Sequence, residues 1–139
     1  MNWITKEVKN LVRRYGTTDP LELADYLNYI VIPYPFKNIR GMLLVIDGTT
    51  CIGVNSNFSR KMQGLVVLHE IGHRLLHPKM NYFMIIEDTL FPAGKFEYQA
   101  NRFVAELVLG ERKPHAGETI YEFAARYEVP VELVKTLAK

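Results

Sequence analysis

Only one cysteine occurs among the 139 residues, long apolar runs are missing, and the net charge is only +2. Cys51 alone cannot form an internal disulfide of the kind that small secreted domains use. No apolar run approaches the roughly 20 residues that cross a bilayer, and the N-terminus lacks a signal-peptide pattern. A nearly balanced charge gives no strong positive field for nucleic acid. These absences predict a cytoplasmic protein without membrane contacts, for which direct DNA binding is not expected.

Apolar material, in contrast, is plentiful. With 48% hydrophobic residues the chain can build a core of its own. We therefore predict one domain over residues 1–139 of the α+β class, mainly helical, with a small antiparallel sheet packed beside a central helix. Its expected parts are N-terminal helices within 1–28, the sheet within 29–55, helices over 59–77 and 95–109, and a helical segment over 116–139.

Turn and cap residues locate the first elements. Helical spacing of apolar residues predicts a helix that ends before Gly16, and Asp19-Pro20 is typical of the start of a second one that reaches Leu27. Strands are expected over 29–32, 41–46 and 49–54. Asp47-Gly48 joins the last two and is a strong signal for a type I′ hairpin turn.

The most informative segment is His69-Glu70-Ile71-Gly72-His73, which places two imidazoles four residues apart with a carboxylate directly after the first. Apolar residues at helical spacing before it, and Pro78 after it, predict a helix over 59–77. On such a helix both histidines lie on one face, about one turn apart, and can bind one metal ion. A lone histidine on an apolar helix is more often a hydrogen-bonded core residue, but here a pair and a glutamate occur together.

His77 is a third histidine on the same predicted helix. Eight residues of helix separate it from His69, which corresponds to about 12 Å of rise, too far for the two to share one ion. We therefore predict that His77 supports the site from behind the ligands or caps the helix C-terminus.

A catalytic zinc site usually has three protein ligands, so a third must come from elsewhere. Glu97 is the best placed candidate, because it lies in the first turn of the predicted helix 95–109 and at the edge of its apolar face. An acidic residue there also complements the helix dipole, and the pattern alone leaves these two interpretations even. Glu106 is better explained by an i,i+4 ion pair with Arg102. The other candidate ligands are Glu87, Asp88, Glu111 and His115, of which Glu87 and Asp88 are expected in a loop. The expected buried face of helix 95–109 consists of Phe96, Ala100, Phe103, Val104, Leu107 and Val108.

Residues 118–139 predict two short helices around 127–130, an arrangement that invites a helix-turn-helix interpretation. Four glutamates oppose three cations in this segment, whereas a groove-binding helix needs a concentrated positive face. We therefore favour a structural or substrate-docking role for it.

Two blocks, residues 69–77 and 97–107, resemble the ImmA/IrrE metallopeptidases of bacteria, phages and integrative elements. The second block, which begins with Glu97-Tyr98-Gln99-Ala100-Asn101, is similar to the family motif whose leading glutamate is the third metal ligand. The segment 51–55 also resembles the family, and the likeness extends from about residue 4 to 109. Val104, where the family prefers alanine, and Gly110 after the second helix depart from its pattern without touching the predicted ligands.

The resemblance implies a zincin-like fold and a gluzincin-like zinc site made by His69, His73 and Glu97, with Mn²⁺ also possible. Glu70 would be the general base of peptide-bond hydrolysis. It further implies a protein substrate, typically a helix-turn-helix repressor of a phage or mobile element, so that the enzyme acts as an anti-repressor. The oligomeric state is left open, and the candidates for oxyanion stabilisation are unranked: Tyr82, Tyr98, His77 and His115.

Two other classes compete with the peptidase. A non-proteolytic binding module could control a repressor by contact, but a structural metal site would not require Glu70. A DNA-binding regulator would bind duplex DNA with a steep salt dependence.

Overall fold

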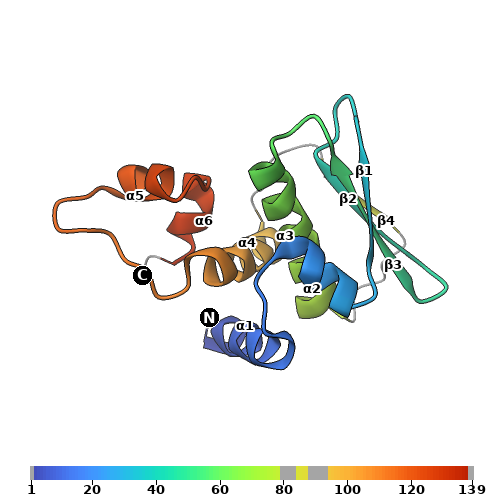
Figure 1. The fold of residues 1–139 in the computed structure, drawn as a ribbon, viewed down its shortest axis with the longest axis horizontal. Coiled ribbons are helices and arrows are strands. Elements are labelled where there is room, and N and C mark those ends of the chain that lie inside the picture. The colour runs from blue at the N-terminus through green and yellow to red at the C-terminus, as the bar shows by residue number, and fades with distance from the viewer. Residues whose placement is uncertain (1, 79–83, 88–93, 138–139) are drawn as a thin grey trace.

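The computed structural model describes residues 2–78, 84–87 and 94–137 and has an α+β architecture (Figure 1). The described helices are α1 (Asn2–Tyr15), α2 (Pro20–Tyr26), α3 (Arg60–Leu76), α4 (Lys95–Leu109), α5 (Ile120–Arg126) and α6 (Val131–Lys135). The described strands are β1 (Ile30–Tyr34), β2 (Gly41–Ile46), β3 (Thr49–Asn55) and β4 (Met84–Glu87). No helix in these ranges is long and apolar enough to span a membrane.

The sheet is mixed, so the expectation of an antiparallel sheet is wrong. Its order is β1-β3-β2-β4; β2 runs antiparallel to β3 and β4, but β1 runs parallel to β3 with Ile30 opposite Cys51. Strands β1, β3 and β4 run in one direction, and β2 runs opposite to them. The β2–β3 hairpin places β3 between β1 and β2, so β1 pairs with a strand of its own direction.

Strand β4 was not expected, and Glu87, predicted in a loop, is its last residue. Asp88 lies outside the described residues. The expected hairpin turn is confirmed, because Asp47 and Gly48 both have positive φ values, 50° and 79°, as a type I′ turn requires.

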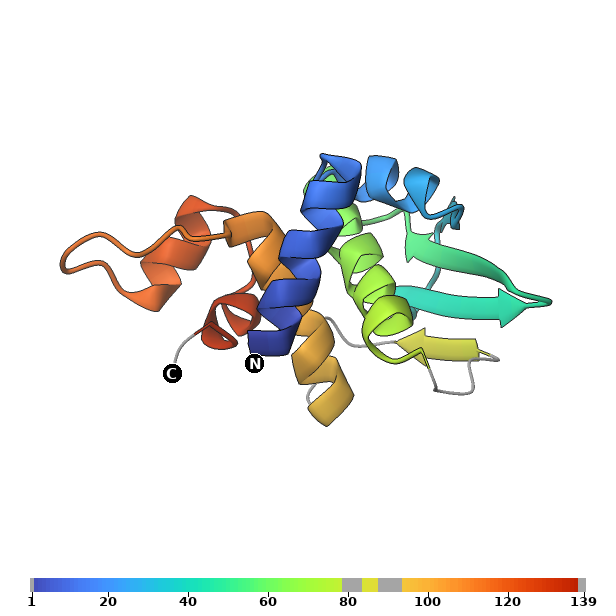
Figure 2. The ribbon, with the colours of Figure 1, turned by 90° about the horizontal axis from the view of Figure 1, so that it is seen from below.

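Helix α3 lies between the sheet on one side and α1 and α4 on the other (Figure 2). The Ser59 hydroxyl caps its N-terminus by accepting the backbone N–H of Met62 at 3.2 Å, and His77 is its C-cap. Residues 65–73 are buried throughout. Helix α3 therefore runs through the core, as its apolar pattern predicts, and carries the histidine pair with it.

Gly72 brings α3 close to α4. A Cβ atom at this position would lie 2.9 Å from Cδ1 of Phe103, whose side chain is 1% exposed. The missing side chain thus lets the two helices that carry the candidate ligands approach each other closely.

We expect Gly72→Ala to lower the free energy of unfolding by about 1–3 kcal/mol, because the added methyl overpacks the core against Phe103. This loss outweighs the gain of about 1 kcal/mol in helix propensity. Denaturant unfolding measures it, and the same substitution in a Phe103→Leu background should cost less. Equal costs in both backgrounds would contradict the proposed overlap.

The two expected C-terminal helices are present as α5 and α6, which pack on each other, and α6 packs on α4. Leu133 and Val134 of α6 are buried. The Thr136 carbonyl accepts hydrogen bonds from the Tyr98 hydroxyl at 3.3 Å and from Arg102 Nη1 at 2.9 Å, both on α4. The segment thus supports the helix that carries Glu97.

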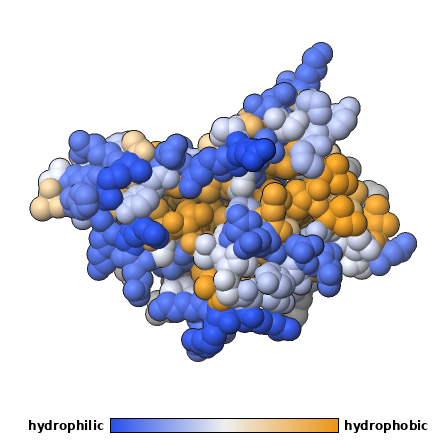
Figure 3. Space-filling view, viewed as in Figure 1, coloured by the Kyte–Doolittle hydropathy of each residue, from blue (hydrophilic) through white to orange (hydrophobic). Residues whose placement is uncertain are grey.

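The outer edge of the sheet is apolar. Ile30, Ile32 and Tyr34 of β1 are 49%, 50% and 58% exposed, and Figure 3 shows hydrophobic surface over this strand. Pro33 lies between them and lacks an N–H group, which hinders edge-to-edge pairing with a further strand.

Candidate metal centre

The structure brings His69 and His73 of α3 together with Glu97 in the first turn of α4. The Glu97 Oε1 atom lies 2.8 Å from His69 Nε2 and 3.0 Å from His73 Nε2. One ligand atom from each of the three residues lies within 4.8 Å of the other two. Both histidines are almost fully buried, whereas Glu97 is 21% exposed. Three residues that can ligate a metal therefore converge on one point.

The donor set fits a zinc or similar ion. Two imidazole nitrogens and one carboxylate oxygen are the ligands of many catalytic zinc sites. Ligand atoms around one tetrahedral ion lie about 3.4 Å apart at usual bond lengths. The observed separations of 2.8 and 3.0 Å need to open by only a few tenths of an ångström, which side-chain rotation can supply.

Glu106, Glu111 and His115 do not join this group. Glu106 accepts hydrogen bonds from Arg102 at 2.8 Å, as its i,i+4 spacing predicts, and from Thr5 at 2.9 Å. Glu111 and His115 are exposed in the connection from α4 to α5. Among residues 2–78, 84–87 and 94–137, His69, His73 and Glu97 form the only cluster of three metal-binding side chains.

His77 supports the histidine pair from behind. Its Nε2 lies 2.7 Å from Gln99 Oε1, and its Nδ1 lies 3.4 Å from His73 Nδ1. Because the Gln99 oxygen is an acceptor, His77 Nε2 carries a hydrogen, and in the neutral ring Nδ1 is then an acceptor. His73 Nδ1 must in turn donate, which leaves the Nε2 lone pair of His73 directed at the metal position.

Burial lowers the pKa of His77, and the hydrogen bond with Gln99 partly opposes this shift. His77 is therefore neutral at pH 7, as the hydrogen-bond chain requires. Phe96, expected on the buried face of α4, is 43% exposed, so that expectation is wrong. It lies in the first turn of α4, where its ring packs on His77 with centroids 4.4 Å apart.

We expect His77→Ala to weaken metal affinity by about 10- to 100-fold, because it removes the acceptor that orients the His73 ring. Competition with a zinc-binding dye measures the affinity. Gln99→Ala should cause a smaller loss of the same kind. Unfolding of the metal-free protein provides the control, since a loss of affinity that merely follows a loss of stability would contradict the orienting role.

Glu70 lies beside a buried arginine that sequence reasoning missed. Glu70 is 0% and Arg40 1% exposed, and Arg40 Nη2 lies 3.9 Å from Glu70 Oε2. Arg40 directly precedes β2, and the Asn55 side chain donates to the Phe36 and Ile39 carbonyls of the same loop. A positive charge held there offsets the cost of burying the Glu70 carboxylate.

We expect Arg40→Met to lower the free energy of unfolding by about 3 kcal/mol, because it leaves the Glu70 charge buried without this compensation. Adding Glu70→Gln should restore most of the loss, since the buried charge is then absent as well. Chemical denaturation of the wild type, both single variants and the double variant tests this coupling. Additive effects would show that the two side chains do not interact.

None of the candidates for oxyanion stabilisation gains support. The Tyr98 hydroxyl donates to the Thr136 carbonyl, and His77 belongs to the chain behind His73. His115 is exposed in a loop, and Tyr82 lies outside the described residues.

Comparison with known proteins gives a consistent result. Residues 24–137 match a peptidase family model described as the IrrE N-terminal-like domain. The chain is 35% identical over 135 residues to Uncharacterized immunity region protein 2 of Bacillus phage phi105, covering 94% of this chain and 85% of the relative. It is 26% identical over 133 residues to Metallopeptidase ImmA of Bacillus subtilis strain 168, covering 91% of this chain and 79% of the relative.

The family match spans most of the chain, including both histidines and Glu97. Membership of a metallopeptidase family implies a metal ion, and the cluster of His69, His73 and Glu97 is a site that can hold one. The chain is therefore a member of the ImmA/IrrE family of metallopeptidases.

Proposed function

We propose that this protein is a zinc-dependent endopeptidase with a zincin-like active site that hydrolyses a peptide bond in a protein substrate. The observation that carries the proposal is the convergence of His69, His73 and Glu97 within 4.8 Å, directly beside Glu70 on α3. A structural metal site has no use for a carboxylate at that position, whereas a peptidase needs one as a base.

The residues divide the chemistry between them. His69, His73 and Glu97 would hold the ion, and the chain formed by His77 and Gln99 would orient one ligand. When bound, zinc would supply Lewis acidity and make the attacking water more acidic, and Mn²⁺ also accepts this donor set. Glu70 follows His69, turned by about 100° around the helix. Its carboxylate takes the proton from the attacking water and passes it to the leaving amine.

The proposed substrate is a helix-turn-helix repressor of a phage or mobile element, which the enzyme inactivates in the cytoplasm as an anti-repressor. Two relatives support this proposal, one by the name of a phage immunity-region protein and one by the name of a metallopeptidase.

The proposal is tested by mixing the zinc-loaded protein with purified helix-turn-helix repressors of phage and mobile-element origin and recording intact masses. We expect one internal cut that a chelator prevents and added zinc restores. A repressor that stays intact but forms a stable complex would favour the non-proteolytic binding module instead.

A further inference from the structure

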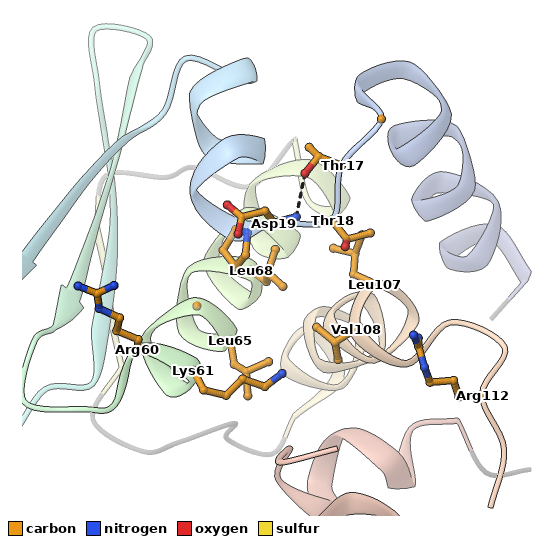
Figure 4. A pocket seen from close by; sticks show the side chains of 13 residues that line it. Thr17, Thr18, Asp19, Arg60, Lys61, Leu65, Leu68, Leu107, Val108 and Arg112 are labelled. Carbon is orange, nitrogen blue, oxygen red and sulfur yellow. Dashed lines mark hydrogen bonds between the residues drawn. The ribbon is translucent and has the colours of Figure 1, made fainter. Parts of the chain in front are cut away.

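A groove separate from the metal centre lies between the N-terminal half of α3 and the C-terminal end of α4 (Figure 4). The connection from α1 to α2 forms its third side. Its volume of about 730 Å³ is typical of a ligand site. Arg60 at the start of α3 is nine residues from His69, or about 13 Å along the helix. The charged end of the groove can therefore contact a substrate without touching the candidate metal ligands.

The floor of the groove is apolar. Its accessible apolar surface comes from Pro20 of α2 and Val108 of α4, which are half-buried, and Leu65 and Leu68 of α3 lie beneath it with 2% and 0% exposure. Figure 3 shows hydrophobic surface between α3 and the C-terminal helices, with hydrophilic surface around it. Such a floor suits a leucine-like side chain better than a sugar or phosphate.

The rim of the groove is positive. Arg60, Lys61 and Arg112 line it, against one carboxylate, Asp19. The Asp19 carboxylate already caps α2 by accepting the backbone N–H of Glu22 at 3.0 Å. In Figure 4, Lys61 and Arg112 lie on either side of Val108, whereas Arg60 points toward the sheet. Two cations thus flank the apolar floor.

These cations have different roles inside the chain. Neither Arg60 nor Lys61 forms an ion pair with any residue that the structure describes. Both lie in the first turn of α3, where a positive charge opposes the helix dipole and an acidic one is favoured. Arg112 is held in place, because it donates to the Leu109 carbonyl at 3.2 Å and its guanidinium lies over the Tyr127 ring. A carboxylate between Lys61 and Arg112 would meet one unused and one oriented cation.

We propose that this groove is a docking site for an acidic–apolar segment of the protein substrate, in which a leucine-like side chain fills the floor and a neighbouring carboxylate lies between Lys61 and Arg112. This inference rests on the proposed function in so far as the partner is the substrate. Nucleic acid fits less well, because its phosphates call for a longer row of cations and gain nothing from an apolar floor. Docking here would strengthen substrate binding without changing the catalytic step.

The test uses the full chain and a fluorescein-labelled peptide with glutamates and leucines at helical spacing, followed by fluorescence anisotropy. We expect saturable binding, weakened about three- to fivefold by Lys61→Glu and less than twofold by the matched control Lys6→Glu on exposed α1. Arg112→Gln provides a second variant, and circular dichroism checks the fold of each. A peptide with glutamines in place of the glutamates should bind more weakly.

Glu70→Gln and a chelator should leave peptide binding unchanged, so this result is independent of any failure to find peptidase activity. When the protein substrate is cleaved, Lys61→Glu should raise the KM for that substrate about three- to fivefold at an unchanged kcat. Absence of saturable binding up to about 1 mM peptide would overturn the proposal. So would equal effects of Lys61→Glu and Lys6→Glu, tighter binding of a 20-base-pair duplex that depends on Lys61, or a dimer in sedimentation that Lys61→Glu abolishes.

Discussion

Glu70→Gln is expected to lower the rate of substrate cleavage by about 10²- to 10⁴-fold while the protein still binds metal and substrate, because it removes the general base and keeps the shape of the side chain. Glutamine cannot take a proton from the attacking water. The substitution also takes the Glu70 carboxylate away from the buried Arg40 side chain, so some loss of stability is expected, and circular dichroism must show that the variant is folded under the assay conditions. Single-turnover cleavage of the repressor, measured with enzyme in excess, separates this loss from slow product release.

The metal content of the Glu70→Gln variant decides how the result is interpreted. An unchanged content with lost cleavage identifies Glu70 as a group that acts in the chemical step. Glu132→Gln, an exposed substitution of the same type on α6, controls for the change in charge. Cleavage at the wild-type rate would refute the assignment, and a pure binding module would show no change in complex formation with either variant.

The two helices of the candidate site could be predicted from sequence because their signals are local. Ser59 caps α3, Pro78 follows its end, and the apolar spacing of α4 repeats through a single run. The structure gives α4 the predicted bounds, Lys95–Leu109, and shortens α3 only by its two cap residues. Caps and periodicity are properties of neighbouring residues, so they survive without tertiary information.

The sheet was predicted less well because strand pairing is a property of distant residues. The Asp47-Gly48 turn specifies the β2–β3 hairpin, which is local. No residue near β1 indicates whether β1 pairs with β2 or with β3. Strand β4 is only four residues long and pairs with β2 across more than 35 positions of sequence. Short strands of this kind carry too little pattern to be recognised.

The same distinction applies to the site. His69 and His73 are four residues apart on one helix, so their spacing alone brings them together. Glu97 had an equally good local explanation, its place in the first turn of a helix, and only the family resemblance separated the two. Arg40 gave no signal, because an arginine before a strand is ordinarily a solvated residue and its burial depends on packing under α3.

Glu97→Ala is expected to reduce the zinc content from about one equivalent to a small fraction and to lower the zinc affinity by about a thousand-fold or more. The variant keeps only two of the three protein ligands that a catalytic zinc site usually has. The wild type and the variant are purified without added metal, and the bound zinc is measured by elemental mass spectrometry. Glu106→Ala, on the same helix and with its carboxylate held by Arg102 and Thr5, is the matched control. It should retain full metal content despite some loss of stability.

The loss should also depend on the distance that the new side chain can reach. Glu97 Oε1 lies within hydrogen-bond distance of both histidines, so Glu97→Asp, with a carboxylate one methylene shorter, keeps the charge but withdraws the oxygen from that position. We therefore expect the aspartate variant to bind zinc more weakly than the wild type and more tightly than the alanine variant. An aspartate variant as poor as alanine would show that geometry dominates, and one equal to the wild type that charge dominates. A wild type that binds no zinc even when zinc is added would refute the metal centre itself, and with it the peptidase, because Glu70 alone has no activated water to deprotonate.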